Sequence, residues 1–107
     1  MGTRTRTPAA YIGVDRARGP VGVARQHYAI SEAVRRKGWP EPTVYVEDAG
    51  AGGRQPAVAD LTGAISAGRH DVLLVSLSTV SGLPPGPLMR LLTGCTRQGV
   101  PVQFLTG

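Results

Sequence analysis

Hydroxyl and carboxylate side chains follow three apolar runs of this chain, and together they could support nucleophilic chemistry. Ser78 lies just beyond an apolar run at residues 72–77, while Asp15 and Asp48 end two shorter runs. If the runs are parallel strands, their carboxyl ends meet at one edge of a sheet, where functional crevices form. A serine beside carboxylates is poorly activated, because no intervening base accepts its proton. The pattern leaves open a small-molecule site at Asp15, Asp48 and Ser78.

Neither histidine is placed to serve as that base. His27 falls within an expected helix and His70 in the turn before the third strand, so we expect surface or structural roles for both. Two carboxylates are too few for a metal site, and we expect no metal. No Gly-x-Gly-x-x-Gly follows the first strand, and no Gly-Lys-Ser/Thr follows the glycine-rich segment at residues 48–53. We therefore expect no cofactor.

Apolar periodicity predicts strands and helices in alternation. The expected strands are residues 10–14, 43–47, 72–77 and 102–105, and the expected helices are 23–37, 56–68 and about 88–99. Glycine and proline predict loops over residues 15–22 and 78–86. Such alternation implies parallel pairing through right-handed crossovers. We predict an α/β three-layer sandwich, with a mostly parallel sheet of four or five strands and helices on both faces.

Composition limits the chain to one globular domain. It has 107 residues, of which 41% are hydrophobic and 18% charged. We expect a basic flexible tail at residues 1–8 and one folded domain at 9–107. No apolar stretch approaches the roughly 20 residues that span a bilayer, and the N-terminus lacks a secretory signal, so we expect a cytoplasmic protein without membrane contact. The single cysteine, Cys95, fits a buried structural position.

Positive charge is concentrated in the first third of the chain. Residues 1–37 carry eight basic and two acidic residues, a net charge of +6 within an overall +5. Such a field can attract nucleic acid or another acidic partner. A solvated tail and a helix end that favours cations explain the same charges, since no aromatic residues alternate with the arginines. The candidate nucleic-acid or anion contacts are Arg4, Arg6, Arg16, Arg18 and Arg25.

Short motifs occur around the ends of the expected strands. They are Tyr-Ile-Gly-Val-Asp at 11–15, Arg-Gln at 25–26, Gly-Trp at 38–39, Tyr-Val-Glu-Asp-Ala-Gly-Ala-Gly-Gly at 45–53, Gln-Pro at 55–56, Gly-Arg-His-Asp at 68–71, Ser-Thr-Val-Ser-Gly at 78–82 and Gly-Val-Pro-Val at 99–102. Their order resembles the catalytic domain of serine recombinases of the resolvase/invertase type over about residues 10–106. The resemblance implies that fold, and a family chemistry in which a serine attacks a DNA phosphodiester while arginines stabilise the phosphate.

The positions that match the family's catalytic residues hold other residue types. Asp15 stands in place of the nucleophilic serine, and Ser78 in place of the aspartate before the arginine pair. The positions of the family's arginines hold Gly13, Gln55, Thr79 and Gly82. Among the positions compared, only Gln26 keeps its type. Because losing even one transition-state donor costs on the order of 100-fold in rate, we expect no catalytic residue in this chain.

We therefore expect a catalytically inactive serine-recombinase-like domain. It would be an interaction or regulatory module, or a degenerate relic of a site-specific recombinase. Its expected partners are DNA, bound weakly and non-specifically, an intact recombinase, or a second copy of the chain. Two alternatives stay open: a small-molecule enzyme or ligand-binding domain that uses Asp15, Asp48 and Ser78, and a non-specific nucleic-acid binder that uses the N-terminal arginines.

Overall fold

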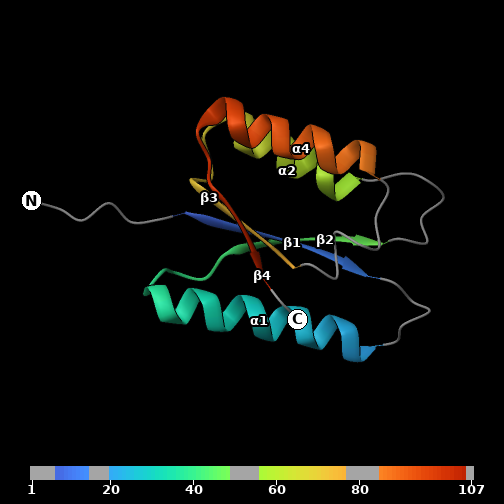
Figure 1. The fold of residues 1–107 in the computed structure, drawn as a ribbon, viewed down its shortest axis with the longest axis vertical. Helices are drawn as coiled ribbons and strands as arrows, with labels where there is room; N and C mark the ends of the chain where they lie inside the picture. Colours follow the sequence, from blue (N-terminus) through green and yellow to red (C-terminus); the bar gives the residue numbers. More distant parts are fainter. Residues whose placement is uncertain (1–6, 15–19, 49–55, 77–84, 106–107) are drawn as a thin grey trace, which may run out of the picture.

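A four-stranded parallel sheet lies between two helical layers in the computed structural model (Figure 1). The structure describes residues 7–14, 20–48, 56–76 and 85–105. The elements in chain order are β1 (Pro8–Val14), α1 (Pro20–Lys37), β2 (Thr43–Asp48), α2 (Pro56–Ser66), β3 (Val72–Ser76), α4 (Pro85–Gln98) and β4 (Val102–Leu105). The predicted α/β class, with parallel strands and helices on both faces, is confirmed. Among the described residues, no helix combines the length and apolarity needed to cross a membrane.

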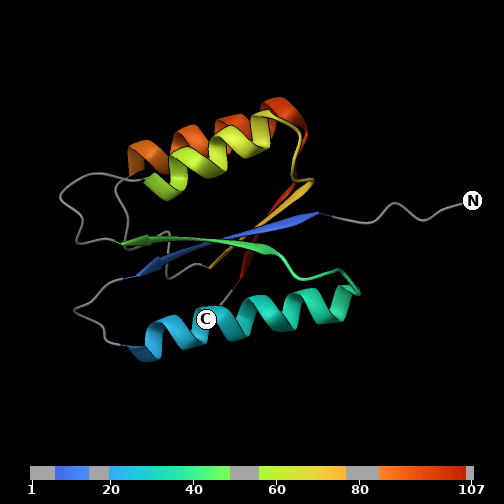
Figure 2. The same cartoon turned by 180° about the vertical axis from the view of Figure 1, so that it is seen from behind.

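The strand order β2-β1-β3-β4 determines which face each helix covers. The connection from β1 to β2 runs in one direction across the sheet, and the connections from β2 to β3 and from β3 to β4 run in the other. Because each crossover is right-handed, α1 covers one face, while α2 and α4 cover the opposite one (Figures 1 and 2). The connections that leave β1 and those that reach β3 and β4 therefore run to opposite sides of the sheet, and the strand order reverses between the neighbouring parallel strands β1 and β3. In parallel sheets, such a switch opens a crevice at the carboxyl ends of the strands.

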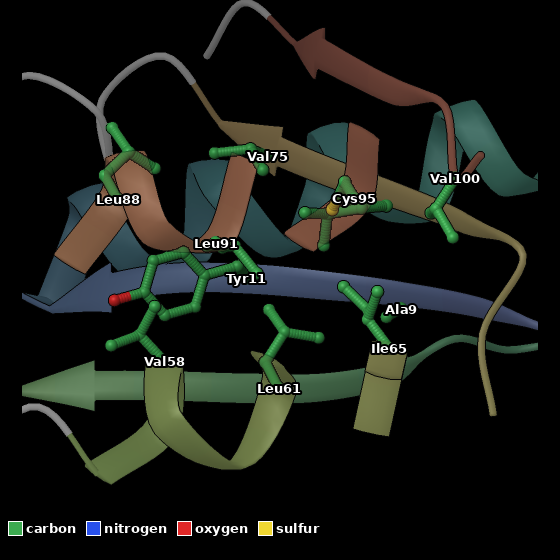
Figure 3. Packing of buried hydrophobic residues seen from close by; sticks show 11 residues of the cluster. Ala9, Tyr11, Val58, Leu61, Ile65, Val75, Leu88, Leu91, Cys95 and Val100 are labelled. Carbon is green, nitrogen blue, oxygen red and sulfur yellow. The ribbon is translucent and has the colours of Figure 1, made fainter. Parts of the chain in front are cut away.

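The larger core lies between the sheet and the pair α2 and α4 (Figure 3). Tyr11 and Val75 project into it from β1 and β3, Leu61 from α2 and Leu91 from α4. Tyr11 is opposite Val75 in the parallel ladder, which puts both side chains on one face. Cys95 is buried in this core, as its place in the sequence pattern predicts, and burial raises the pKa of its thiol.

The core under α1 is smaller. Ala10, Ile12 and Leu74 from the sheet pack there with Ile30 and Val34 of α1. The helix makes most of its sheet contacts with β1 and β3. One helix does not cover a four-stranded face, so apolar side chains at the edge of this face remain exposed. They are Val44 (37% exposed) and Val46 (50%) on β2.

Two helices begin earlier than the sequence predicts. Residues 20–22 and 85–86 were expected in loops, but α1 begins at Pro20 and α4 at Pro85. Proline suits the first helical position, because its fixed φ is already helical and its missing N–H has no partner there. Gly22 and Gly86 lie within the first turn, where glycine costs less than in a helix interior, in which it costs about 1 kcal/mol relative to alanine. At both positions, the preference of proline for the start of a helix outweighs the tendency of the nearby glycine to form a loop.

The helix C-termini, in contrast, match the glycine signals. Gly38, Gly68 and Gly99 have positive φ angles of 66°, 75° and 68°. At each one, the following amide donates to the carbonyl five residues earlier: Trp39 to Val34, Arg69 to Ala64 and Val100 to Cys95. This left-handed cap satisfies carbonyls that the helix end leaves free. Residues with a Cβ would be strained at these three positions.

The first strand starts two residues before the expected residue 10. Thr7 joins the folded part as well, since its amide donates to Asp71 Oδ1 at 2.8 Å and its carbonyl accepts from the Asp71 amide at 3.3 Å. Pro8 lies opposite Val72 in the ladder. The boundary expected between a tail at 1–8 and the domain therefore moves, because Thr7 and Pro8 belong to the fold.

Candidate functional site

The carboxyl ends of β1, β2 and β3 lie side by side, as the prediction of a crevice requires. These strands end at Val14, Asp48 and Ser76, with β1 between the other two. Most of the predicted site residues lie in the segments after these ends, which are outside the described residues. Those residues are Asp15, Arg16, Arg18, Gln55, Ser78, Thr79 and Gly82, and Arg4 and Arg6 near the N-terminus are also outside. Asp48 ends β2, so the structure places its backbone at the predicted edge.

Gly13 and Gln26 are two predicted site residues that the structure brings together. Gln26 is buried, with 4% of its surface exposed, and its Nε2 donates to the Gly13 carbonyl at 2.9 Å. This bond fastens the end of β1 to α1, the helix that follows it. The neighbouring candidate Arg25 is exposed. Gln26 therefore has a structural function at the carboxyl end of β1.

A buried carboxylate, Glu47, occupies the same end of the sheet on the other face. It is 1% exposed and accepts hydrogen bonds from the Val58 amide at 3.0 Å, the Ala57 amide at 3.3 Å and the Tyr11 hydroxyl at 3.3 Å. The amides belong to the first turn of α2, where backbone N–H groups lack helical partners and favour a negative charge. Glu47 therefore caps α2 from β2 and holds the end of β2 next to the start of α2.

The apolar pattern predicts a strand at Glu47 and no further role for it. Two signals were present: Glu47 shares a strand face with Tyr45, and Pro56 marks a helix start nine residues later. A carboxylate facing a buried layer needs donors, and an uncapped helix N-terminus supplies them. Because Glu47 occupies these amides, they are not free to bind an anionic ligand.

Tyr11 completes this cluster as a permanent donor. Burial, followed by the negative charge of Glu47 and the hydrogen bond to it, raises the pKa of the Tyr11 hydroxyl well above its usual range. The hydroxyl therefore stays protonated at neutral pH and donates to Glu47.

Ser76 at the end of β3 has no exposed surface, so its hydroxyl is closed to a substrate in this conformation.

His70 lies at the opposite, amino-terminal end of the strands. Its Nδ1 is 3.2 Å from the Thr7 carbonyl, and its Nε2 is 2.8 Å from the Tyr45 hydroxyl. Because a carbonyl only accepts, Nδ1 carries the proton and Nε2 accepts from Tyr45. His70 is buried and joins β2 to the turn before β3, while His27 is exposed on α1. The structural or surface roles predicted for the two histidines are confirmed.

The comparisons with known proteins give no relative: no family model, no curated protein and no solved structure matches the chain. Within the described residues, no group of three or more histidine, cysteine, aspartate or glutamate side chains is arranged to hold a metal ion. Function is therefore inferred from the fold and from the residue types at the carboxyl ends of the strands.

The first prediction concerns the Glu47 cap. Replacing Glu47 with alanine leaves two amides and the Tyr11 hydroxyl without their acceptor, and we expect the free energy of unfolding to fall by about 2–4 kcal/mol. Glu47→Gln keeps one acceptor oxygen and should cost less. Urea denaturation followed by circular dichroism measures both. Glu32→Ala is the control, because Glu32 pairs with Arg35 on the surface of α1 and should cost less than about 1 kcal/mol. Equal losses for Glu47→Ala and Glu32→Ala would contradict the capping role.

The second prediction concerns alkaline pH. The pKa of Tyr11 is higher in the folded than in the unfolded chain, so its contribution to stability is complete below about pH 10 and is lost as pH rises further. Cys95 adds a loss in the same direction from its own ordinary pKa upward. Tyr11→Phe should cost about 1 kcal/mol at pH 7 and flatten the decline above pH 10. Urea midpoints between about pH 8 and 11 test this. Tyr28→Phe is the comparison: a hydrogen bond to Glu32 also raises the pKa of Tyr28, but on the exposed surface of α1, so its effect on the slope should be much smaller. A Tyr11→Phe variant with the wild-type slope would refute it.

Proposed function

We propose that this chain is a recombinase-like α/β domain that does not cleave DNA and acts as an interaction module. One observation supports the proposal most strongly: the end of β1, where the resembled family has its nucleophilic serine, is followed by Asp15. A carboxylate beside a phosphodiester repels it and offers no hydroxyl for attack. The fold is compatible with this family relationship, because the sheet is parallel and has helices on both faces.

The groups that would stabilise the phosphate are also absent from the matched positions. Gly13 in the first strand and Gln55, directly before Pro56, stand where the family has arginines, and Thr79 and Gly82 stand where it has the pair after the third strand. Gln26 keeps its type, but its amide bonds the backbone of β1. Phosphoryl transfer depends on donors aimed at the developing charge, so this set of residues supports a domain without cleavage chemistry.

The interaction role rests on what the fold leaves accessible. β2 and β4 are the edge strands of the sheet, and apolar side chains are exposed on both, including Phe104 at 47% on β4. An open strand edge with apolar residues favours association with another chain, such as an intact recombinase or a second copy. DNA contact through the N-terminal arginines would be non-specific and would weaken steeply with salt.

A cleavage assay tests the first part of this proposal. Supercoiled plasmid incubated with the purified protein, then denatured in detergent, should show neither nicking nor a covalent protein–DNA adduct. The Asp15→Ser variant should also form none, because a restored hydroxyl still lacks the arginines that stabilise the transition state. A detergent-resistant adduct with the wild-type protein would overturn the proposal. An adduct with Asp15→Ser alone would show that the phosphate-binding groups are still present.

A ligand-binding site at Asp15, Asp48 and Ser78 is the second candidate. The reversal of strand order between the parallel strands β1 and β3 favours it, because ligands bind at such points in parallel sheets. If a small molecule binds there, it raises the melting temperature of the wild-type protein by mass action. A thermal-shift screen of cationic and hydroxylated metabolites should then yield a compound that stabilises the wild type by several degrees and the Asp15→Ala variant much less. A compound that stabilises both proteins equally would place its site elsewhere.

A further inference from the structure

A groove of about 510 Å³ runs between α2 and α4 on the surface that faces away from the sheet. Both helices follow parallel strands of one sheet and lie side by side along their length (Figures 1 and 2). The groove is lined by Thr62 and Ser66 from α2 and by residues between 89 and 98 of α4, among them Arg90, Arg97 and Gln98. This surface is distinct from the carboxyl ends of the strands, and its residues have no role in the site described above.

The charge of the groove is positive and uncompensated. Arg90 and Arg97 are exposed, and no acidic residue lines the groove. Asp60, the one acidic residue of α2, is not part of the lining, and α4 contains no acidic residue. The two arginines are seven residues apart, which places them on the same side of α4 about 10 Å from each other along its axis. A complementary partner carries negative charges at that spacing.

Two threonines, Thr62 and Thr93, lie between the arginines, and neither offers a free donor. Thr62 Oγ1 donates to the Val58 carbonyl at 2.7 Å, and Thr93 Oγ1 donates to the Met89 carbonyl at 2.8 Å. Each threonine thus donates its only hydroxyl proton to a carbonyl of its own helix and has no proton left to donate to a phosphate. The Met89 side chain, 59% exposed, adds a flexible apolar contact. Ser66 and Gln98, the remaining polar side chains of the lining, are the last residues of α2 and α4. No continuous row of donors for a nucleic-acid backbone therefore runs from Arg90 to Arg97.

Gly94 gives the groove its depth. A Cβ at this position would lie 3.7 Å from Thr62 Cγ2, an ordinary van der Waals distance, and Gly94 itself places no side chain above the contact between the helices. A trough between two helices, with a small residue near its middle and a charge toward each end, fits a third helix.

From this combination we propose that the α2/α4 groove binds an acidic amphipathic helix of a partner protein. Two carboxylates seven residues apart on that helix face Arg90 and Arg97, and an apolar side chain between them packs against Met89. The inference rests on the interaction role proposed above and names the class of partner that one surface takes. Exposed ion pairs contribute little by themselves, so the contact is weak and salt-sensitive unless the apolar part adds to it.

A peptide probe tests the inference on the full chain. The probe is a synthetic helical peptide of about 18 residues, with glutamates at peptide positions 5 and 12, leucines at positions 8 and 9, and alanine and glutamine elsewhere. In a ¹⁵N nuclear magnetic resonance titration, we expect saturable shifts centred on the amides of Thr62, Met89 and Gly94. The double variant Arg90→Glu/Arg97→Glu should weaken binding by about ten-fold or more and should instead bind a matched peptide that has lysines at positions 5 and 12.

Two further variants separate charge from shape and from loss of the fold. Arg36→Glu/Arg69→Glu makes the same change in net charge at exposed positions outside the groove and should leave binding nearly unchanged. Gly94→Leu keeps both arginines but fills the trough, and should abolish the shifts while the spectrum stays folded. Gly94→Leu also decides the question if the charge-reversed variant does not fold.

Three outcomes would overturn the inference. These are the absence of groove shifts at about 1 mM peptide, equal affinity for the acidic and the lysine peptide, and tighter binding of a 16-base-pair DNA duplex to the same amides. None of them depends on DNA cleavage, so failure of the peptide test and failure of the cleavage-free function proposed above are distinguishable.

Discussion

A central strand that is buried on both faces sets the position of every other element in this fold. Ala9, Ala10, Tyr11 and Ile12 of β1 have no exposed surface, and they alternate between the two cores. β1 also pairs with both β2 and β3. A slip of one residue in its register would move Tyr11 from the α2/α4 core to the smaller core under α1, and would separate its hydroxyl from Glu47. The two helical layers and the Glu47 cap thus depend on one alignment.

The two helical layers cover the two faces of the sheet to different extents. α2 and α4 pack against each other over the larger core and leave Phe104 at the β4 edge of their face 47% exposed, whereas α1 is alone on the other face. Apolar edge residues such as Val46 are exposed for that reason, since the right-handed crossovers leave no second helix for that face among the described elements. The same rule brings α2 and α4 side by side, which creates the groove lined by Arg90 and Arg97. The exposed valines of β2 on the α1 face and the cationic groove on the opposite side of the molecule are therefore both consequences of the strand order.

Strong local signals made most of the fold predictable from the sequence. The apolar run of β3 predicts a strand buried on both faces, and all five of its residues are buried. The glycines after the three helices predict their ends because only a left-handed residue completes the caps. The starts of α1 and α4 are not predictable in the same way. Pro20 follows Gly19 and Pro85 precedes Gly86, and both pairs also favour loops.

The candidate site was predictable in its location but only partly in its residues. Parallel pairing alone puts the ends of β1, β2 and β3 at one edge, whatever their side chains are. The role of Glu47 depends on the distance between a strand end and a helix start that are joined by residues 49–55, and sequence spacing does not fix that distance. Gln26 was identified through the family resemblance, while its bond to the Gly13 carbonyl depends on how α1 lies on the sheet. Tertiary placement, rather than residue type, supplied both missing contacts.

The contrast between the retained and the altered polar residues has a physical explanation under the proposed function. Gln26, the one retained residue, is buried and donates to the Gly13 carbonyl, so replacing it would leave a buried group unpaired at a cost of about 1–3 kcal/mol. That is a large part of the 5–15 kcal/mol that keeps a typical domain folded. Arginines that only contact a DNA phosphate contribute little to folding, and surface substitutions usually change stability by less than about 0.5 kcal/mol. A chain no longer selected for cleavage would therefore lose its phosphate-binding arginines and keep residues such as Gln26, which is the combination found here.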